Sequence, residues 1–268
     1  MAPSTFQSSV TVTHIGTATA ILSIDGLNIL TDPYFSPDGT VWDRGVYVLT
    51  NHYTPALSLS ELPPIDAVLL SHEDHPDNLD ELGRQLLDGR RVLTTRDGAR
   101  KLAPRPGVKG LAPWETTILE MGGRRFEVTG TPCEHLPGGE CTGFIMTEPS
   151  FGRSADGKPN AIYFSGDTVY FPELTQIRER WNISLALLNL GAASVRPPGS
   201  EALLMITMDG KQAVQLVRDL GVEVVVPMHF ENWDHFKEDR ESLKRAIEEG
   251  GIEKNVVWLE PGVATKVL

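Results

Sequence analysis

Short apolar runs separated by polar and turn residues dominate the chain and predict strands. The first three span residues 10–14, 18–24 and 27–30, and Asp25-Gly26 between the second and third is a two-residue hairpin signal. Bounded apolar runs at 67–70, 185–190 and 222–226 are typical of strands buried on both faces. Further strands are predicted at 91–94, within 116–129 on either side of Gly122-Gly123, and at 143–147, 161–165, 256–259 and 264–267.

Helical spacing of apolar residues is found at 79–87, 172–180, 211–220 and 237–249. Asp209 can cap the third of these helices, with Gln212 completing a capping box. The strands come in two batches, each interleaved with helices. This order predicts an α/β fold in which two packed sheets carry helices outside, a four-layer sandwich forming one domain over residues 1–268.

Charge and composition exclude several classes of function. The 24 basic and 36 acidic residues give a net charge of −12, which disfavours binding to nucleic acid or to anionic membranes. The two cysteines form no disulfide framework, and the first residues lack the pattern of a secretory signal. We therefore expect a cytoplasmic protein that acts on a small molecule without nucleic-acid or membrane partners, and that is compatible with homo-oligomerisation.

The segment of residues 72–80, His-Glu-Asp-His-Pro-Asp-Asn-Leu-Asp, follows directly on a predicted buried strand. Imidazole nitrogens and carboxylate oxygens offered together suit zinc, iron or manganese. The alternative is a solvated turn before a helix, with Asp77 as the helix cap.

Three other predicted strands also end next to a residue of metal-ligand type, namely His135, Asp167 and His229. In α/β sheets, functional sites gather at the carboxyl ends of the strands. Because four separate strand ends deliver such residues, the sequence predicts a metal site there.

Five ordered segments, Thr13–Thr19, Ile29–Pro33, the 72–80 cluster, Ser165–Thr168 and Pro227–His229, resemble the metallo-β-lactamase superfamily of hydrolases. The first two segments resemble most the branch of the ascorbate-phosphate lactonases and N-acyl-phosphatidylethanolamine phospholipases. The resemblance spans essentially the whole chain and implies the αββα sandwich of the metallo-β-lactamase type.

The family pattern His-x-His-x-Asp-His can be placed on this chain in two ways. Counting forward from His72 puts Asp74 at the second ligand position. Counting back from Leu79-Asp80 puts Asn78 at the last histidine, and it keeps His75 and Asp77 as ligands at the cost of one inserted residue. We prefer the second placement because it retains more good metal ligands.

The resemblance then implies that His72, His75 and His135 hold one metal. Asp77 and His229 would hold another, and Asp167 would bridge the two. Because a neutral amide is a weak donor, Asn78 predicts a weak or empty second site, and hence one or two zinc ions per chain, with manganese or iron as alternatives.

Other residues are expected around these ligands. Asp32, where the resemblance places an acidic residue, would orient a ligand imidazole, unless it is only a turn residue before Pro33. Asp74 and Asn78 would lie just outside the ligand set.

Three residues are candidates for proton transfer, namely Asp77, Asp167 and His235. Asp77 or Asp167 would orient the nucleophile and pass a proton to the leaving group. His235 would meet a substrate oxygen or the leaving group, unless it is a surface histidine at a helix start.

The long segment 34–64 carries aromatic residues and is typical of a functional loop. Tyr34 and Trp42 from this loop, together with Trp233, are our candidates for an apolar substrate wall, unless they merely anchor loops. In the second loop, 191–208, Arg196 is the residue able to clamp a phosphate.

These observations favour a metal-dependent hydrolase of a small carbonyl compound, namely a lactone, lactam or other ester or amide, attacked by hydroxide produced at the metal. The resemblance also admits a phosphodiesterase or phospholipase-D-like hydrolase. Asn78 leaves open a third interpretation, a non-catalytic protein that binds a metal or metabolite.

Overall fold

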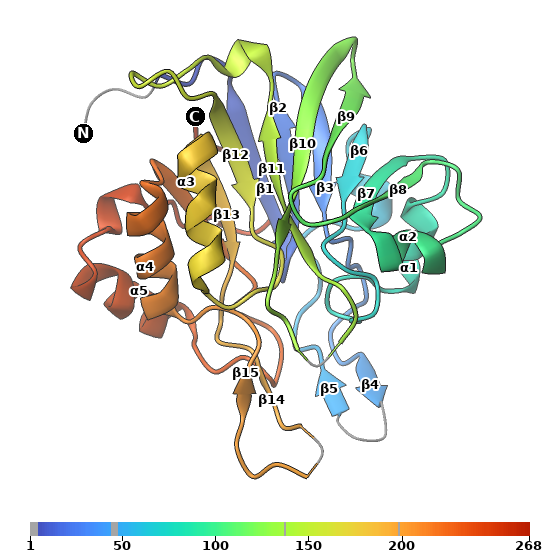
Figure 1. Ribbon diagram of the computed structural model, residues 1–268. Helices are drawn as coiled ribbons and strands as arrows, with labels where there is room; N and C mark the ends of the chain where they lie inside the picture. Colours follow the sequence, from blue (N-terminus) through green and yellow to red (C-terminus); the bar gives the residue numbers. More distant parts are fainter. Residues whose placement is uncertain (1–4, 44–47, 137, 198) are drawn as a thin grey trace.

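Two β-sheets face each other at the centre of the molecule, and helices cover the outer face of each (Figure 1). The computed structural model describes residues 5–43, 48–136, 138–197 and 199–268. Seven strands form the first sheet, in the order β17-β1-β2-β3-β6-β7-β8, and six form the second, in the order β16-β13-β12-β11-β10-β9. The predicted four-layer αββα sandwich is confirmed.

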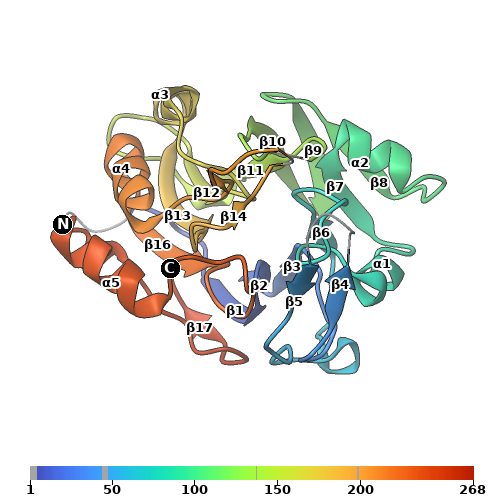
Figure 2. The same ribbon diagram turned by 90° about the horizontal axis from the view of Figure 1, so that it is seen from below.

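The first sheet consists of β17 (Thr265–Lys266), β1 (Val10–Gly16), β2 (Thr19–Ile24), β3 (Leu27–Thr31), β6 (Ala67–Leu69), β7 (Arg91–Thr95) and β8 (Val108–Leu111). The second consists of β16 (Val224–Met228), β13 (Asn182–Asn189), β12 (Asn160–Phe164), β11 (Thr142–Thr147), β10 (Arg124–Pro132) and β9 (Thr116–Met121). Helices α1 (Glu81–Leu86) and α2 (Arg96–Lys101) lie on the side of the first sheet. Helices α3 (Gln176–Arg180), α4 (Gly210–Leu220) and α5 (Arg240–Glu249) lie on the side of the second (Figure 2). Short 3-10 turns occupy Leu59–Glu61, Pro149–Phe151, Pro172–Thr175 and Glu253–Asn255.

Three apolar layers hold the sandwich together, and the period-two alternation of strand side chains assigns residues to them. In β13, Leu185 and Leu187 belong to the cluster between the two sheets. Their neighbours Ala186 and Leu188 belong to the cluster that includes residues of α3, α4 and α5. A third cluster joins Val68 of β6 to residues of α1 and to the apolar residues of the 57–65 segment.

Most predicted elements are present, with their ends shifted by one to three residues. Asp25 and Gly26 both have positive φ angles, 49° and 87°, as the predicted two-residue hairpin requires. The strand predicted at 256–259 is wrong: Val256 forms an isolated bridge with Val225, next to the turn Glu253–Asn255.

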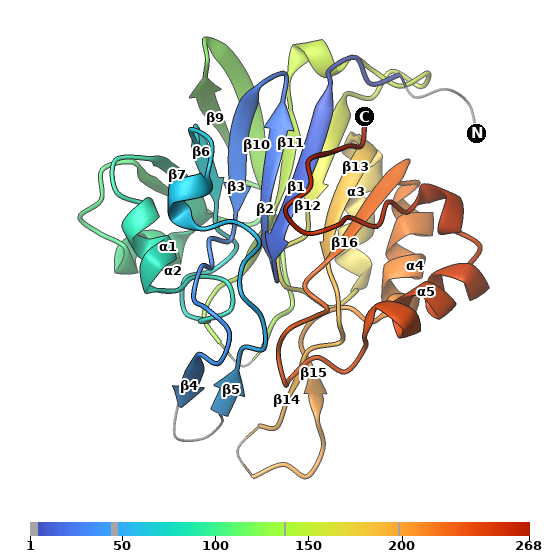
Figure 3. The same ribbon diagram turned by 180° about the vertical axis from the view of Figure 1, so that it is seen from behind.

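Two hairpins extend the long loops that the sequence predicts. Strands β4 (Val41–Asp43) and β5 (Val48–Thr50) pair within the 34–64 segment, and β14 (Ser194–Val195) pairs with β15 (Leu204–Met205) within 191–208. Both hairpins project from the same end of the sandwich (Figures 1 and 3). No helix in the described part of the chain is long and apolar enough to cross a membrane.

Strand direction brings the candidate residues to this same end. Strands β12, β13 and β16 are mutually parallel, as are β3, β6 and β7. Strand β10 runs in the same direction as β12, because β11 is antiparallel to both. The chain therefore emerges at the same end of the sandwich after each of five strands, namely β3, β6, β10, β12 and β16 (Figure 1).

Helix α4 depends on its predicted cap. The Asp209 carboxylate accepts a hydrogen bond from the Gln212 amide at 2.7 Å. Replacing Asp209 by alanine leaves that donor without its cap, so we expect the free energy of unfolding to fall by about 1 kcal/mol in urea titrations. Asp38→Ala, at an exposed aspartate outside any helix, should stay within about 0.5 kcal/mol of the wild type. Equal losses in both variants would contradict the capping role.

Candidate metal centre

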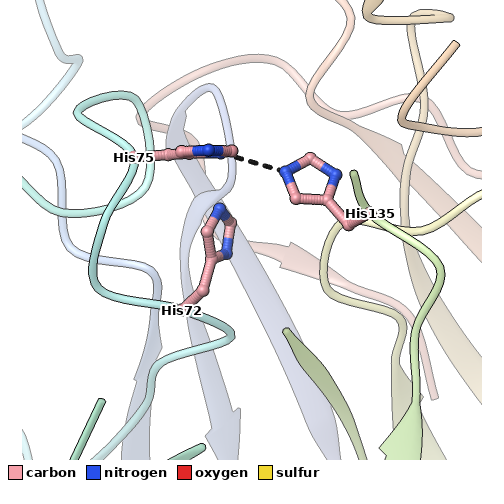
Figure 4. A group of neighbouring side chains, drawn as sticks. All are labelled: His72, His75 and His135. Atoms are coloured by element: carbon pink, nitrogen blue, oxygen red, sulfur yellow. Dashed lines mark hydrogen bonds between the residues drawn. The ribbon is translucent and has the colours of Figure 1, made fainter. Parts of the chain in front are cut away.

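Three histidine rings from two strand ends face one another (Figure 4). His72 and His75 follow β6, and His135 follows β10. The Nε2 atom of His135 lies 3.0 Å from Nδ1 of His75. One ring nitrogen from each of the three residues lies within 4.8 Å of the others, which is the arrangement of a set of metal ligands.

Hydrogen bonds behind two of these rings fix their orientation. The Nδ1 atom of His135 lies 2.7 Å from the Ile206 carbonyl oxygen. The Nδ1 atom of His72 lies 2.8 Å from the Ser71 hydroxyl, which donates to the Asp32 carboxylate at 2.7 Å. With Nδ1 engaged in this way, Nε2 is the nitrogen that each of these two rings can offer to a metal.

Asp32 therefore acts differently from our expectation. It contacts no imidazole directly. One carboxylate oxygen accepts from the Ser71 backbone amide at 2.6 Å, and the other accepts from the Ser71 hydroxyl and from the Asn78 amide at 2.9 Å. Burial raises the pKa of Asp32 to about 7, against these hydrogen bonds. Asp32 can thus orient His72 only through Ser71.

The electrostatics of the histidine cluster favour a cation. Burial and the neighbouring rings of His75 and His135 lower the pKa of His72 to about 3, so its ring is neutral at physiological pH. Its Nε2 atom is buried and has no hydrogen-bond partner among the described residues. A divalent metal ion would satisfy this lone pair, so the residues present fit a metal.

A second group of ligand-type residues adjoins the first through Asp167. The Oδ2 atom of Asp167 lies 3.9 Å from Nε2 of His72, 3.9 Å from Nε2 of His135 and 3.4 Å from Nε2 of His229. Its Oδ1 atom accepts from the Asn189 side chain at 2.7 Å. Asp167 therefore stands between the three-histidine cluster and His229.

Asp77 belongs to this second group. Its Oδ2 atom lies 3.4 Å from Nε2 of His229 and 3.2 Å from Nε2 of His235. Burial opposes ionisation of Asp77, but these two imidazoles outweigh it and hold the pKa well below its usual range. Burial also lowers the pKa of His229, but the carboxylates of Asp167 and Asp77 overcome this and raise it to about 9.

The side chains of Asp74 and Asn78, which we expected just outside the ligand set, bind groups other than the imidazoles. The Asp74 carboxylate accepts from the Gly139 backbone amide at 2.8 Å, and the Asn78 side chain donates to Asp32. Helix α1 is capped by Asp80, which accepts from the Gly83 amide at 2.7 Å. The alternative interpretation of Asp77 as the cap of this helix is therefore wrong.

A cavity of about 520 Å³ opens over both groups. Residues of both groups line it, namely His75, Asp77, His135, Asp167, His229 and His235. The remaining lining comes from Leu49 of β5 and from the 193–206 segment, including Ala193, Val195, Arg196 and Ile206. The site is thus a polar base beneath largely apolar walls.

The predicted aromatic wall is not part of this lining. Tyr34, Trp42 and Trp233 pack against one another, with ring centroids 5.3 to 5.7 Å apart. Tyr34 and Trp233 are buried, and the Trp233 indole donates to the Thr17 hydroxyl at 2.9 Å. None of the three lines the cavity in the described structure, so the alternative that they anchor loops fits better.

Several contributors were not foreseen from the sequence. Ser71 and Asn189 orient a histidine and a carboxylate, and both are buried polar residues at the ends of apolar strands. That position is the signal that could have identified them. Leu49 and Val195 carry no such signal, because their places on the cavity wall depend on the hairpins.

Comparison with known proteins identifies the family to which this chain is related. Residues 27–230 match the family model described as a beta-lactamase superfamily domain. A protein of Hyperthermus butylicus named a metal-dependent hydrolase is 27% identical, with 94% of this chain and 96% of that protein aligned. An uncharacterized protein of Mycobacterium tuberculosis is 30% identical over 86% of this chain and 60% of its own length.

Two solved structures share the fold. A metallo hydrolase of Ignicoccus hospitalis superposes with a TM-score of 0.72 at 24% identity, covering 97% of this chain and 99% of that one. An isothiocyanate hydrolase from Delia radicum gut bacteria superposes with a TM-score of 0.74 at 20% identity, covering 96% of this chain and 100% of that one.

The Ser71 hydroxyl offers a test of the histidine cluster. Ser71→Ala removes the contact to His72 but leaves the backbone amide of residue 71 bonded to Asp32. We expect the affinity of the tightest metal site to fall by about 10- to 100-fold, measured by competition with a chelator. Ser184→Ala, at a buried serine near the opposite end of β13, should leave that affinity unchanged. Equal affinities in the Ser71 variant and the wild type would refute this role.

Proposed function

The chain belongs to the beta-lactamase superfamily and is a metal-dependent hydrolase, and from this premise we propose that it hydrolyses a small, largely uncharged carbonyl compound using zinc. The substrate class would be a lactone, lactam or other ester or amide. The observation that supports it is the cavity, in which apolar walls enclose a base of histidines and carboxylates. Such walls favour apolar groups, while the base supplies the polar contacts.

The charges around the cavity disfavour a phosphodiester. Among the described lining residues, Arg196 is the only lysine or arginine. Its guanidinium already donates to the Glu201 carbonyl oxygen. Asp77 and Asp167 place two carboxylates at the base. An anionic phosphate would therefore meet like charge with one engaged arginine to offset it.

The chain's own residues divide the chemical tasks. His72, His75 and His135 would hold a metal, with Asp167 beside them. When bound, a divalent metal such as zinc, manganese or iron supplies an activated nucleophile near neutral pH and polarises the substrate oxygen. Asp77 is ionised at neutral pH, so it can accept a hydrogen bond from the attacking water and orient it.

A substrate panel tests this proposal. We expect the metal-loaded protein to hydrolyse at least one neutral lactone, lactam, activated ester or amide, and a chelator to abolish the turnover. An isothiocyanate belongs in the panel, because a structural relative carries that activity in its name. Asp77→Ala should lower kcat/KM by about 10²- to 10⁴-fold. Clear cleavage of phosphodiesters beside inert carbonyl substrates would overturn the proposal.

The cavity wall predicts a size limit on the substrate. Val195 of β14 is partly exposed and lines the cavity, so Val195→Phe should narrow it without touching the histidine cluster. We expect KM to rise for bulky acyl groups more than for small ones, while the metal content per chain stays the same. Val41→Phe, at an exposed position of the β4–β5 hairpin outside the lining, serves as the control. Uniform effects on all substrates would argue against this wall.

A further inference from the structure

We propose that His235 is a metal ligand, and that Asp77, Asp167, His229 and His235 together form a second divalent-metal site. His235 would supply the nitrogen that Asn78 cannot. The matched family segment ends at residue 230, so His235 lies outside it. The inference rests on metal dependence but on no particular substrate, so it can fail or succeed independently of the carbonyl proposal.

Three short contacts link the four donors into a continuous chain. From His235 Nε2 to Asp77 Oδ2 the distance is 3.2 Å, and from that oxygen to His229 Nε2 it is 3.4 Å. His229 Nε2 lies a further 3.4 Å from Asp167 Oδ2. Zinc bonds to nitrogen and oxygen of about 2.0 to 2.2 Å imply donor separations of about 3.3 to 3.6 Å around a tetrahedron. The three contacts observed along this chain are close to that edge length.

The buried environment of His229 also suits a cation. The Nε2 atom of His229 is buried and has no hydrogen-bond partner among the described residues, although two carboxylates lie 3.4 Å away. Its Nδ1 atom lies 3.4 Å from the Leu190 carbonyl oxygen, so Nε2 is the nitrogen directed at the carboxylates. A metal among these atoms would satisfy the nitrogen and both acids together.

The loop that carries His235 is held from both sides. Trp233 is anchored in the cluster with Tyr34 and Trp42. Asp234 pairs with His52 at 2.5 Å, and the His235 carbonyl oxygen accepts from the Ser194 amide at 3.0 Å. These contacts fix the backbone on either side of His235, so its ring is placed beside Asp77 before any ligand binds.

Asn78 is committed to another task. Its amide nitrogen donates to Asp32, and Asp32 in turn holds the hydroxyl that orients His72. Position 78 therefore supports the first site, while the ligand that the family pattern expects there comes from a different loop. This arrangement removes the reason for expecting an empty second site.

The second site should be the weaker of the two. The Nδ1 atom of His235 has no partner among the described residues, whereas Nδ1 of His135 is held by the Ile206 carbonyl oxygen. Partners behind a ligand contribute about 10- to 100-fold to metal affinity. We therefore expect two metal equivalents per chain, bound in two steps.

Metal titration tests this assignment without any substrate. The full chain, purified without a histidine tag and stripped by chelator, is titrated with Zn²⁺ by calorimetry, and the metal retained is counted by elemental mass spectrometry. We expect two equivalents in the wild type. In His235→Ala and His235→Gln we expect one tight equivalent at unchanged affinity, with the second step weakened at least about tenfold. The retained tight equivalent shows that the variant is folded.

The control is Glu120→Gln, which removes an exposed carboxylate of β9 that lies outside the cavity lining and should keep both steps. Two equivalents of wild-type affinity in both His235 variants would overturn the proposal, and a lowered kcat in those variants would then assign His235 to proton transfer. As a measurement on the unaltered chain, the second Zn²⁺ equivalent should shift the ¹⁵N resonance of His235 Nε2. An unmoved resonance with both equivalents bound would also overturn the assignment.

Discussion

The buried carboxylate of Asp167 is the point on which the two halves of the site depend. Its Oδ2 atom lies within 3.9 Å of imidazoles from three strand ends, and Asn189 holds its other oxygen. An unpaired carboxylate at this depth would cost several kcal/mol, so the surrounding imidazoles and any cation they bind are a condition of the fold as well as of the chemistry. Opposed sheets whose strands end at one edge of the sandwich are what bring these groups together.

Much of the sandwich follows from local patterns in the sequence. The alternation in the first three strands, the Asp25-Gly26 turn and the capped helix α4 depend only on residues that are close in the sequence. The failures lie where pairing or packing overrides the pattern. Strand β8 contains an exposed lysine and a glycine, and α2 has the sequence RDGARK, so neither carries a clear periodic signal. Residues 256–259 are apolar enough for a strand, but they follow a turn and contribute one bridge.

The candidate site could be predicted only in part, for a similar reason. Residues such as His135 and Asp167 were identifiable because each follows an apolar strand. The contact between Asp32 and His72 through Ser71 depends on side-chain directions, and the contact between His235 and Asp77 depends on how a loop returns to the sheet. The aromatic residues were recognisable as a group, but composition does not distinguish a wall that faces a ligand from a cluster that anchors loops.

The two hairpins at the open end of the sandwich form part of the cavity wall but carry none of the described ligand-type residues at its base. Leu49 of β5 and Val195 of β14 line the cavity, whereas the ligand-type residues at its base follow strands of the two sheets or lie on the 229–235 segment. Insertions or substitutions in the hairpins can therefore reshape the pocket while the charges beneath it stay balanced. For an evolving lineage, this means that a new substrate can be acquired without passing through an ancestor that has lost its reactive centre.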